Sequence, residues 1–196
     1  MTSFRITRGF PSDARSRAAQ LYWEAFRGKL EDMTQPERKA LDFLERVIDP
    51  EFPFSALNRS GDLLGLAGFK TSTGSLVGGD LSDLVQSYGW LGDSWRGTLF
   101  SFLERNVETG ALVMDGICVA TASRSPGVGG ALLSAIREEA ARLHSHSVRL
   151  AVIDINPRAR AFYERQGFTA ETEVSIGPLR HVFRFRRSTT MHCPIG

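Results

Sequence analysis

The sequence is poor in the residues that mark several large classes of protein. Its 196 residues include only two cysteines, Cys118 and Cys193. Two are too few for a disulfide framework or a cysteine-built metal cluster, so we expect a reducing, cytoplasmic setting. The four histidines, at positions 144, 146, 181 and 192, show no metal-ligand spacing with carboxylates or cysteines. No metal site is therefore predicted.

Long apolar runs and a strong net charge are missing as well. No stretch reaches the roughly 20 apolar residues that a membrane-spanning helix needs, and the opening MTSFRITRGF lacks the apolar core of a secretion signal. We therefore expect no membrane association. The formal net charge is +2, which is too small to favour nucleic acid as a partner. The arginines of RHVFRFRR would have to carry such a function, and a charged edge strand that discourages aggregation explains them better.

What remains has the composition of an ordinary soluble domain, with 42% apolar and 23% charged residues. The hydrophobic periodicity predicts strands and helices in the order 3–8 (strand), 11–27 (helix), 34–48 (helix), 52–70 (hairpin), 111–120 (strand), 128–146 (helix), 148–155 (strand), 157–166 (helix), 168–176 and 179–186 (hairpin). Hairpins together with a β-α-β unit predict an α/β fold, a mixed sheet of about seven strands with helices on both faces. We expect a single domain over 1–187, with a helical insertion at 80–106 and a C-terminal tail at 188–196.

A glycine-rich loop, RSPGVGG, separates the strand at 111–120 from the helix that follows. The first turn of a helix has unpaired backbone N–H groups and a partial positive charge, and glycines let an anion approach them closely. A tight turn without any ligand explains the loop by itself equally well. A nucleotide P-loop does not fit, because Ala131 and Leu132 follow Gly130 where lysine and a hydroxyl residue are needed. Leu132 also occupies the place of the third glycine of a dinucleotide-binding loop.

The better match is Arg-x-x-Gly-x-Gly, which resembles the pyrophosphate loop of the GNAT superfamily of acyl-CoA-dependent N-acetyltransferases. The apolar positions of that family's fourth strand correspond to Met114, Ile117 and Val119. After the loop, the pattern Asn-x-x-Ala-x-x-Phe-Tyr and then Gly-Phe is matched by Asn156, Ala159, Phe162, Tyr163, Gly167 and Phe168. The ordered occurrence of these weak patterns, rather than any one of them, carries the resemblance.

The resemblance implies a GNAT-like acyl-CoA N-acyltransferase fold and acetyl-CoA as the donor, with no metal. The loop N–H groups would bind the pyrophosphate, and the pantetheine arm would pair with the exposed edge of the fourth strand like an added strand. The residues implied to contact the donor are Ile117, Cys118, Val119, Arg124, Ser125, Gly127, Val128, Gly129, Gly130, Asn156, Ala159 and Phe162. Asn156 is equally well suited to cap the helix that begins at Pro157.

The resemblance also implies catalytic roles. Tyr163 holds the family position of the acid that protonates the leaving thiolate, although a residue packed beside Phe162 is the alternative. Many relatives carry a glutamate base where this chain has Val113. Asp115 lies two residues later on the same strand face and is the candidate base, the alternative being a structural partner for an arginine or a loop N–H. The first two helices border the acceptor site in this family, so Glu24 and Glu31 are candidate acceptor contacts.

The predicted function is direct transfer of an acetyl group from acetyl-CoA to a primary amine of a small-molecule or peptide acceptor in a ternary complex. A covalent intermediate is not expected, because Cys118 has no histidine partner within sequence reach. The alternative is a non-catalytic acyl-CoA-binding or sensing module, which the absence of a glutamate at position 113 favours. The oligomeric state stays open, and a homodimer is the arrangement frequent in the family.

Overall fold

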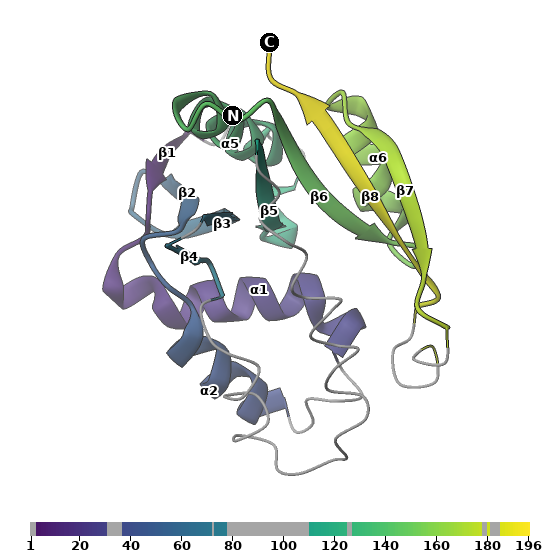
Figure 1. Ribbon diagram of the computed structural model, residues 1–196. Helices are drawn as coiled ribbons and strands as arrows, with labels where there is room; N and C mark the ends of the chain where they lie inside the picture. The colour runs from purple at the N-terminus through teal and green to yellow at the C-terminus, as the bar shows by residue number, and fades with distance from the viewer. Residues whose placement is uncertain are drawn as a thin grey trace.

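The computed structural model describes residues 3–30, 37–71, 73–77, 110–124, 127–177, 180 and 185–196. These residues form one mixed sheet with helices on both faces (Figure 1), so the predicted α/β class is confirmed. The strands are β1 (Phe4–Arg8), β2 (Pro53–Asn58), β3 (Leu63–Thr71), β4 (Gly74–Ser75), β5 (Ala111–Val119), β6 (Ser147–Ile153), β7 (Thr169–Ser175) and β8 (Arg187–Pro194). The helices are α1 (Arg15–Leu30), α2 (Glu37–Val47), α5 (Val128–Arg142) and α6 (Pro157–Arg165), with short 3-10 turns at Ser12–Ala14 and Thr121–Ser123.

The strands follow the order β1-β2-β3-β5-β6-β8-β7 across the sheet, and β4 pairs with β3. Neighbouring strands are antiparallel except β5 and β6, which are parallel and connected through α5. The hairpin of β2 and β3 and the β-α-β unit agree with the sequence prediction. The expected insertion at 80–106 lies outside the described residues.

The prediction for the C-terminal end was wrong. Most of the expected tail at 188–196 belongs to β8, which pairs with β6 on one side and with β7 on the other. The described residues of the expected strand at 179–186 do not lie in a strand. The alternating LRHVFRFR pattern looked more strand-like than the polar RSTTMHCP, yet strand formation depends on which segment can pair with a neighbour. Met191 and Cys193 of β8 are buried in the core.

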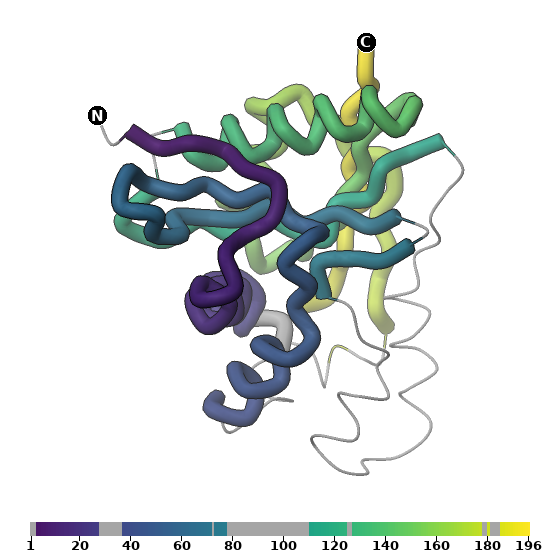
Figure 2. Tube along the Cα trace, turned by 90° about the vertical axis from the view of Figure 1, so that its left-hand side faces the viewer, coloured from purple at the N-terminus to yellow at the C-terminus, as the bar shows by residue number. Residues whose placement is uncertain are grey.

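Apolar side chains form one cluster on each face of the sheet. Helices α5 and α6 cover one face, where Leu132 and Ile136 pack with Phe168 and the strands. Helices α1 and α2 cover the other face, where Leu21 and Phe43 pack with Leu66. Figure 2 shows α5 and α1 on opposite sides of the sheet. Each helix therefore presents its side chains to a different face of β5, which lies between them.

Strands β5 and β6 separate from each other after a short stretch of pairing. Only Ala111–Val113 pairs with Ser147–Arg149. Beyond these residues β5 continues beside β3, whereas β6 continues beside β8. The register of β5 against β3 skips Asp115, which is a β-bulge, and bulges bend a strand and increase its twist. Within the described residues, the edge of β5 from Met114 to Val119 thus faces a gap in the sheet.

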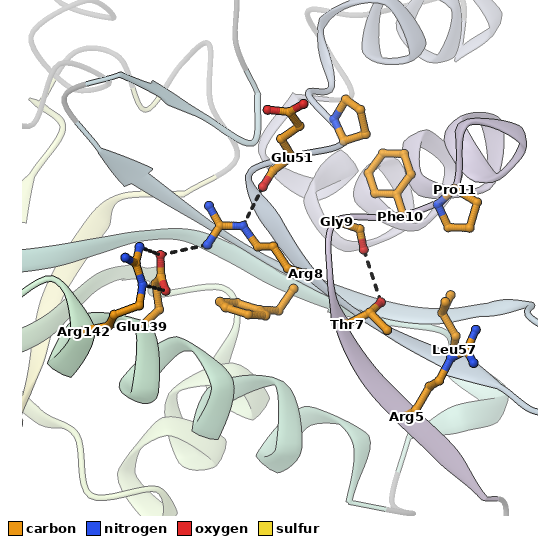
Figure 3. A pocket seen from close by; sticks show the side chains of 12 residues that line it. Arg5, Thr7, Arg8, Gly9, Phe10, Pro11, Glu51, Leu57, Glu139 and Arg142 are labelled. Carbon is orange, nitrogen blue, oxygen red and sulfur yellow. Dashed lines mark hydrogen bonds and ion pairs between the residues drawn. The ribbon is translucent and has the colours of Figure 1, made fainter.

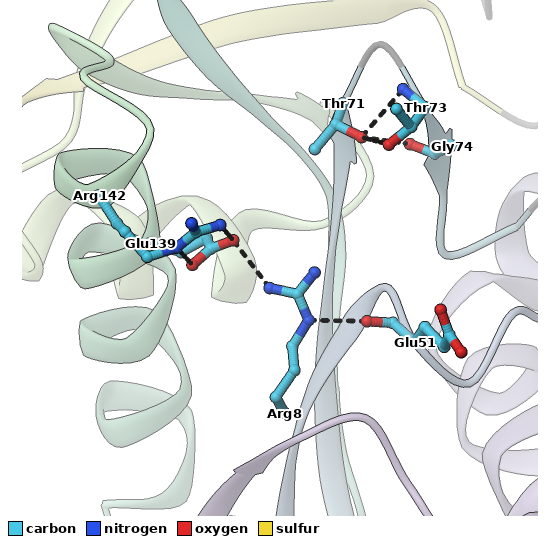
Figure 4. Close-up of polar contacts among 7 residues, drawn as sticks. All are labelled: Arg8, Glu51, Thr71, Thr73, Gly74, Glu139 and Arg142. Atoms are coloured by element: carbon cyan, nitrogen blue, oxygen red, sulfur yellow. Dashed lines mark hydrogen bonds and ion pairs between the residues drawn. The ribbon is translucent and has the colours of Figure 1, made fainter.

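A charged network holds β1 against the C-terminal end of α5 (Figure 3). The carboxylate of Glu139 is nearly buried and accepts from Arg8 Nη1 at 2.8 Å and from Arg142 Nε at 2.7 Å. Arg8 Nε also donates to the carbonyl of Glu51 at 2.7 Å (Figure 4). The Arg8 guanidinium lies 4.6 Å from the centre of the Phe69 ring. The hydrogen bond from Arg142 and the contacts with Arg8 lower the pKa of Glu139 to about 2.

We predict that Glu139→Gln lowers the free energy of unfolding by about 2 kcal/mol near neutral pH, after allowance for solvent around the two arginines. Because the folded pKa of about 2 lies below the ordinary value of 4.5, the stabilisation is present above pH 4.5 and is lost as the pH falls toward 2. The difference between wild type and variant should therefore shrink over this range in urea unfolding followed by circular dichroism. The exposed neighbour variant Glu138→Gln is the control, and an equal loss in both variants would contradict the assignment.

Candidate functional site

The N-terminal end of α5 is open and uncapped. Gly127 precedes the helix in a left-handed conformation with φ of 85°, which glycine adopts without strain, and it contributes no side-chain cap. The first helical hydrogen bond runs from the Ala131 N–H to the Gly127 carbonyl, so the N–H groups of Val128, Gly129 and Gly130 have no acceptor within the helix. A Cβ at Gly127 would meet no atom within 4 Å, and one at Gly130 would meet only Gln166 Nε2 at 3.9 Å. This end of α5 can accommodate an anion.

The loop before α5 is attached to the end of β5. Arg124 Nε donates to the carbonyl of Val119 at 3.1 Å, which holds the guanidinium beside the strand end. Ser125, a predicted donor contact, lies outside the described residues. This loop and helix end thus hold the residues that the sequence analysis assigns to the donor pyrophosphate, namely Arg124 and the glycines at 127, 129 and 130.

The predicted donor strand, Ile117 to Val119, lies along the separated part of β5. One edge of this segment pairs with Gly65–Ala67 of β3. Gly65 permits this close pairing, because a Cβ there would lie 2.7 Å from the Cys118 carbonyl oxygen. The opposite edge faces the gap between β5 and β6, where the Val119 carbonyl accepts from Arg124 and the other backbone groups of the edge are placed to pair with an extended ligand.

Helix α6 places its motif residues beside the first turn of α5. Asn156 Oδ1 accepts from the Ala159 N–H at 3.1 Å, so the helix-capping role of Asn156 is confirmed. A Cβ at Gly129 would lie 3.3 Å from Phe162 Cζ, so glycine lets α6 approach α5 closely here. Ala159 and Phe162 are partly buried against the core, and contact of these residues with a donor remains a prediction.

Tyr163 is a buried phenol on α6. Its ring is 5% exposed and packs between Phe162 and Phe168, with ring centres 5.3 and 5.6 Å away. Burial raises the pKa of Tyr163 well above its ordinary value, and the nearby Cys118 thiol of β5 raises it further. Tyr163 is therefore packed beside Phe162, its role as an acid stays a prediction, and the same burial keeps a proton on the phenol at neutral pH.

Asp115 occupies the bulge of β5 and already has structural partners. Its carboxylate accepts from the Leu76 N–H at 2.9 Å and lies 3.5 Å from Lys70 Nζ. Lys70 stands opposite Val113 across the strand pair, which agrees with the predicted common face of Val113 and Asp115. Burial raises the pKa of Asp115, while the Lys70 charge and the Leu76 N–H act in the opposite direction.

Sequence reasoning missed two aromatic residues of α1 beside this bulge. Tyr22 and Phe26 have ring centres 4.4 Å apart, and a Cβ at Gly116 would lie 2.3 Å from Phe26 Cζ. Burial raises the pKa of the Tyr22 phenol, and Asp115 raises it further. Their helical spacing indicated only that both side chains face the core. The sequence therefore held no signal that distinguishes Tyr22 and Phe26 from ordinary core residues.

A hollow of about 520 Å³ lies between α1 and the loop after β5. Its charged lining residues are Arg17, Glu24, Arg27 and Arg124. The structure therefore brings Glu24, a predicted acceptor contact, next to the loop that leads to α5. Glu31, the other predicted acceptor contact, lies outside the described residues.

A larger hollow of about 970 Å³ lies beside β1 and includes Glu139 and Arg142. These residues belong to the C-terminal end of α5, whereas the open N–H groups lie at its N-terminal end. A helix of 15 residues is about 22 Å long, so the larger hollow is remote from the predicted site despite its size.

Residues 16–168 match the family described as the Acetyltransferase (GNAT) family. The chain belongs to the GNAT acetyltransferase family. The match covers most of the chain and includes β5, the glycine loop and α6, so the resemblance inferred from the motifs is confirmed. A comparison with curated proteins finds no match.

Solved structures of acetyltransferases share the fold of this GNAT family member. A GCN5-related N-acetyltransferase from Kribbella flavida superposes with a TM-score of 0.62 at 16% identity, over 97% of each chain. Another structure, described as an acetyltransferase, gives 0.60 at 17% identity, covering 98% of this chain and all of the other. Ard1 from Thermoplasma volcanium gives 0.56 at 18% identity, over 98% of each chain. At these identities the likeness establishes the fold alone.

Two further features of the described residues bear on this family member. Across the described ranges, no helix combines the length and apolar character needed to cross a membrane. No group of three or more histidine, cysteine, aspartate or glutamate side chains within the same ranges is arranged to hold a metal ion.

We predict that neither Tyr163 nor Tyr22 ionises in the folded chain near pH 10, because burial raises the pKa of both phenols. Tyr163→Phe and Tyr22→Phe should each leave the rise in tyrosinate absorbance near pH 10 unchanged in native conditions. In denaturant each variant should lose one tyrosine's share of the signal, which is the internal control. A native-state loss in either variant would show that its phenol is accessible.

Proposed function

We propose that this protein is an N-acetyltransferase that transfers an acetyl group from acetyl-CoA to a primary amine. The observation that supports this most strongly is the joint presence of an open helix end at Gly127–Gly130 and an open strand edge at Ile117–Val119. One suits a diphosphate and the other suits an amide-bearing arm. Few ligands other than an acyl-CoA carry both groups in sequence along one molecule.

The residues at this site fit acetyl-CoA, which supplies an acetyl group activated as a thioester. The N–H groups of Val128, Gly129 and Gly130 bind the diphosphate, and Arg124 contributes a positive charge beside them. The edge of Ile117–Val119 that faces the gap between β5 and β6 orients the pantetheine amides. Backbone N–H groups on the bulged part of β5 polarise the acetyl carbonyl.

Two side chains handle protons in this proposal. Tyr163 keeps its proton at neutral pH because it is buried, and it donates that proton to the departing thiolate. Asp115 accepts the proton of the attacking amine through water, since burial makes its carboxylate more basic than an exposed aspartate. The contacts with Lys70 and the Leu76 N–H hold the Asp115 carboxylate in place.

Attack by a protein thiol is not part of the proposal. Cys118 and Cys193 are both buried and not disulfide-bonded, which supports a reducing, cytoplasmic setting. Cys118 packs in the core on the α1 face of β5, so we infer direct attack by the amine on the thioester.

A non-catalytic acyl-CoA-binding module is the second candidate. The observation in its favour is that Val113 replaces the family glutamate while Asp115 is engaged by Lys70 and Leu76. Following free thiol while a panel of amines is added to protein and acetyl-CoA separates the two candidates. Amine-dependent release of CoA supports the enzyme, and tight binding without release supports the module.

We predict that Gly130→Glu weakens acetyl-CoA binding by about tenfold or more, or about 1.4 kcal/mol. The side chain has room, because the nearest atom to its Cβ would be Gln166 Nε2 at 3.9 Å. A carboxylate in the first turn is compatible with helix stability but repels a diphosphate. Calorimetry of acetyl-CoA binding measures the effect, and Gly130→Gln is the matched neutral control. Equal affinities for the two variants would refute a diphosphate at this helix end.

We predict that Tyr163→Phe slows amine-dependent thiol release by about a hundredfold or more, because the proton donor is lost. The ring contacts with Phe162 and Phe168 persist in this variant, so acetyl-CoA affinity and thermal stability should stay near wild type. Steady-state kinetics and calorimetry together provide the measurement. An unchanged kcat would remove Tyr163 from the mechanism.

A further inference from the structure

The hollow between α1 and the loop after β5 carries an excess of positive charge. Three arginines line it, two from α1 and Arg124 from the loop, against the single carboxylate of Glu24. Guanidinium groups gathered around one cavity are suited to binding a carboxylate or phosphate, since each presents several donors in a planar arrangement. We call these residues, Arg17, Glu24, Arg27 and Arg124, the arginine hollow.

The charges of the arginine hollow are only weakly neutralised by the protein. Glu24 Oε1 lies 3.8 Å from Arg17 Nη1, and these side chains are 46% and 41% exposed. An exposed ion pair at this distance contributes little energy, so a bound anion can compete for Arg17. Arg124 uses its Nε to bond a backbone carbonyl. The structure shows no ion pair between Arg27 and a carboxylate within the described residues.

The position of the arginine hollow relative to the sheet favours binding of the acceptor over binding of the donor. The open N–H groups that suit the donor diphosphate belong to α5, on one face of the sheet. Two of the three arginines of the arginine hollow, Arg17 and Arg27, belong to α1, which covers the opposite face (Figure 2), and the rest of the lining comes from Glu24 and the loop after β5. A second molecule that approaches from the α1 face can therefore reach a donor that lies along the edge of β5.

We propose that Arg17 and Arg27 of the arginine hollow bind an anionic group of the acceptor, while Arg124 serves the donor diphosphate, so that the acceptor is an amine bearing a distal carboxylate or phosphate. This inference rests on the proposed acetyl transfer.

The test compares two amines of equal size, 6-aminohexanoate and its neutral analogue 6-aminohexanamide. We expect the wild type to use the carboxylate form with at least a tenfold higher kcat/KM, measured by thiol release. Arg27→Glu should bring this ratio close to one without changing the affinity for acetyl-CoA. Arg165→Glu, the same charge reversal at an exposed arginine in the last turn of α6, is the matched control and should keep the wild-type ratio.

Each outcome separates this inference from the proposed function. If both amines are acetylated equally by the wild type, the enzyme stands and the anionic acceptor is overturned. If Arg27→Glu weakens acetyl-CoA binding and slows both amines alike, the arginine hollow binds the donor and the inference is also overturned. If neither amine releases thiol, calorimetric binding of 6-aminohexanoate decides: binding that Arg27→Glu abolishes supports the inference, and its absence from the wild type overturns it.

Discussion

The separation of β5 from β6 is the constraint on which the rest of the site depends. Parallel pairing between these strands ends after Val113, while each strand continues beside another partner. Backbone groups on this edge of β5 are thereby not used in pairing with β6, and the Val119 carbonyl among them accepts from Arg124. The bulge at Asp115 bends β5 at the same place and shifts the alternation of its side chains by one residue. As a result, Ile117 packs toward α5 and Cys118 packs toward α1.

The two ends of α5 handle the helix dipole in different ways. At the C-terminal end, Glu139 would be unfavourable alone, and Arg8 and Arg142 compensate for it while attaching β1. At the N-terminal end, glycines leave the N–H groups without a side-chain cap. The protein thus stabilises one end of α5 internally and leaves the positive end, where we propose the donor diphosphate, without a side-chain cap. The arginine hollow adds a second positive region on the opposite face of the sheet.

Motif spacing predicted much of the local structure at the proposed donor site. Arg124, Gly127 and Gly129 form the loop and helix end that the sequence indicated, and Asn156 caps the helix that carries Tyr163. The acceptor side was far less predictable. Tyr22 and Phe26 look like ordinary core residues in the sequence, and their proximity to Asp115 and Gly116 arises because α1 crosses β5.

The sequence by itself determined the family, the order of most elements and the glycine loop, because these depend on local spacing and on residues with special backbone properties. Only the tertiary structure decided that RSTTMHCP is a strand between β6 and β7, that Asp115 sits in a bulge beside Lys70, and that three arginines share one hollow. Strand pairing and charge clustering join segments distant along the chain. Local patterns do not encode which distant segment will be the partner.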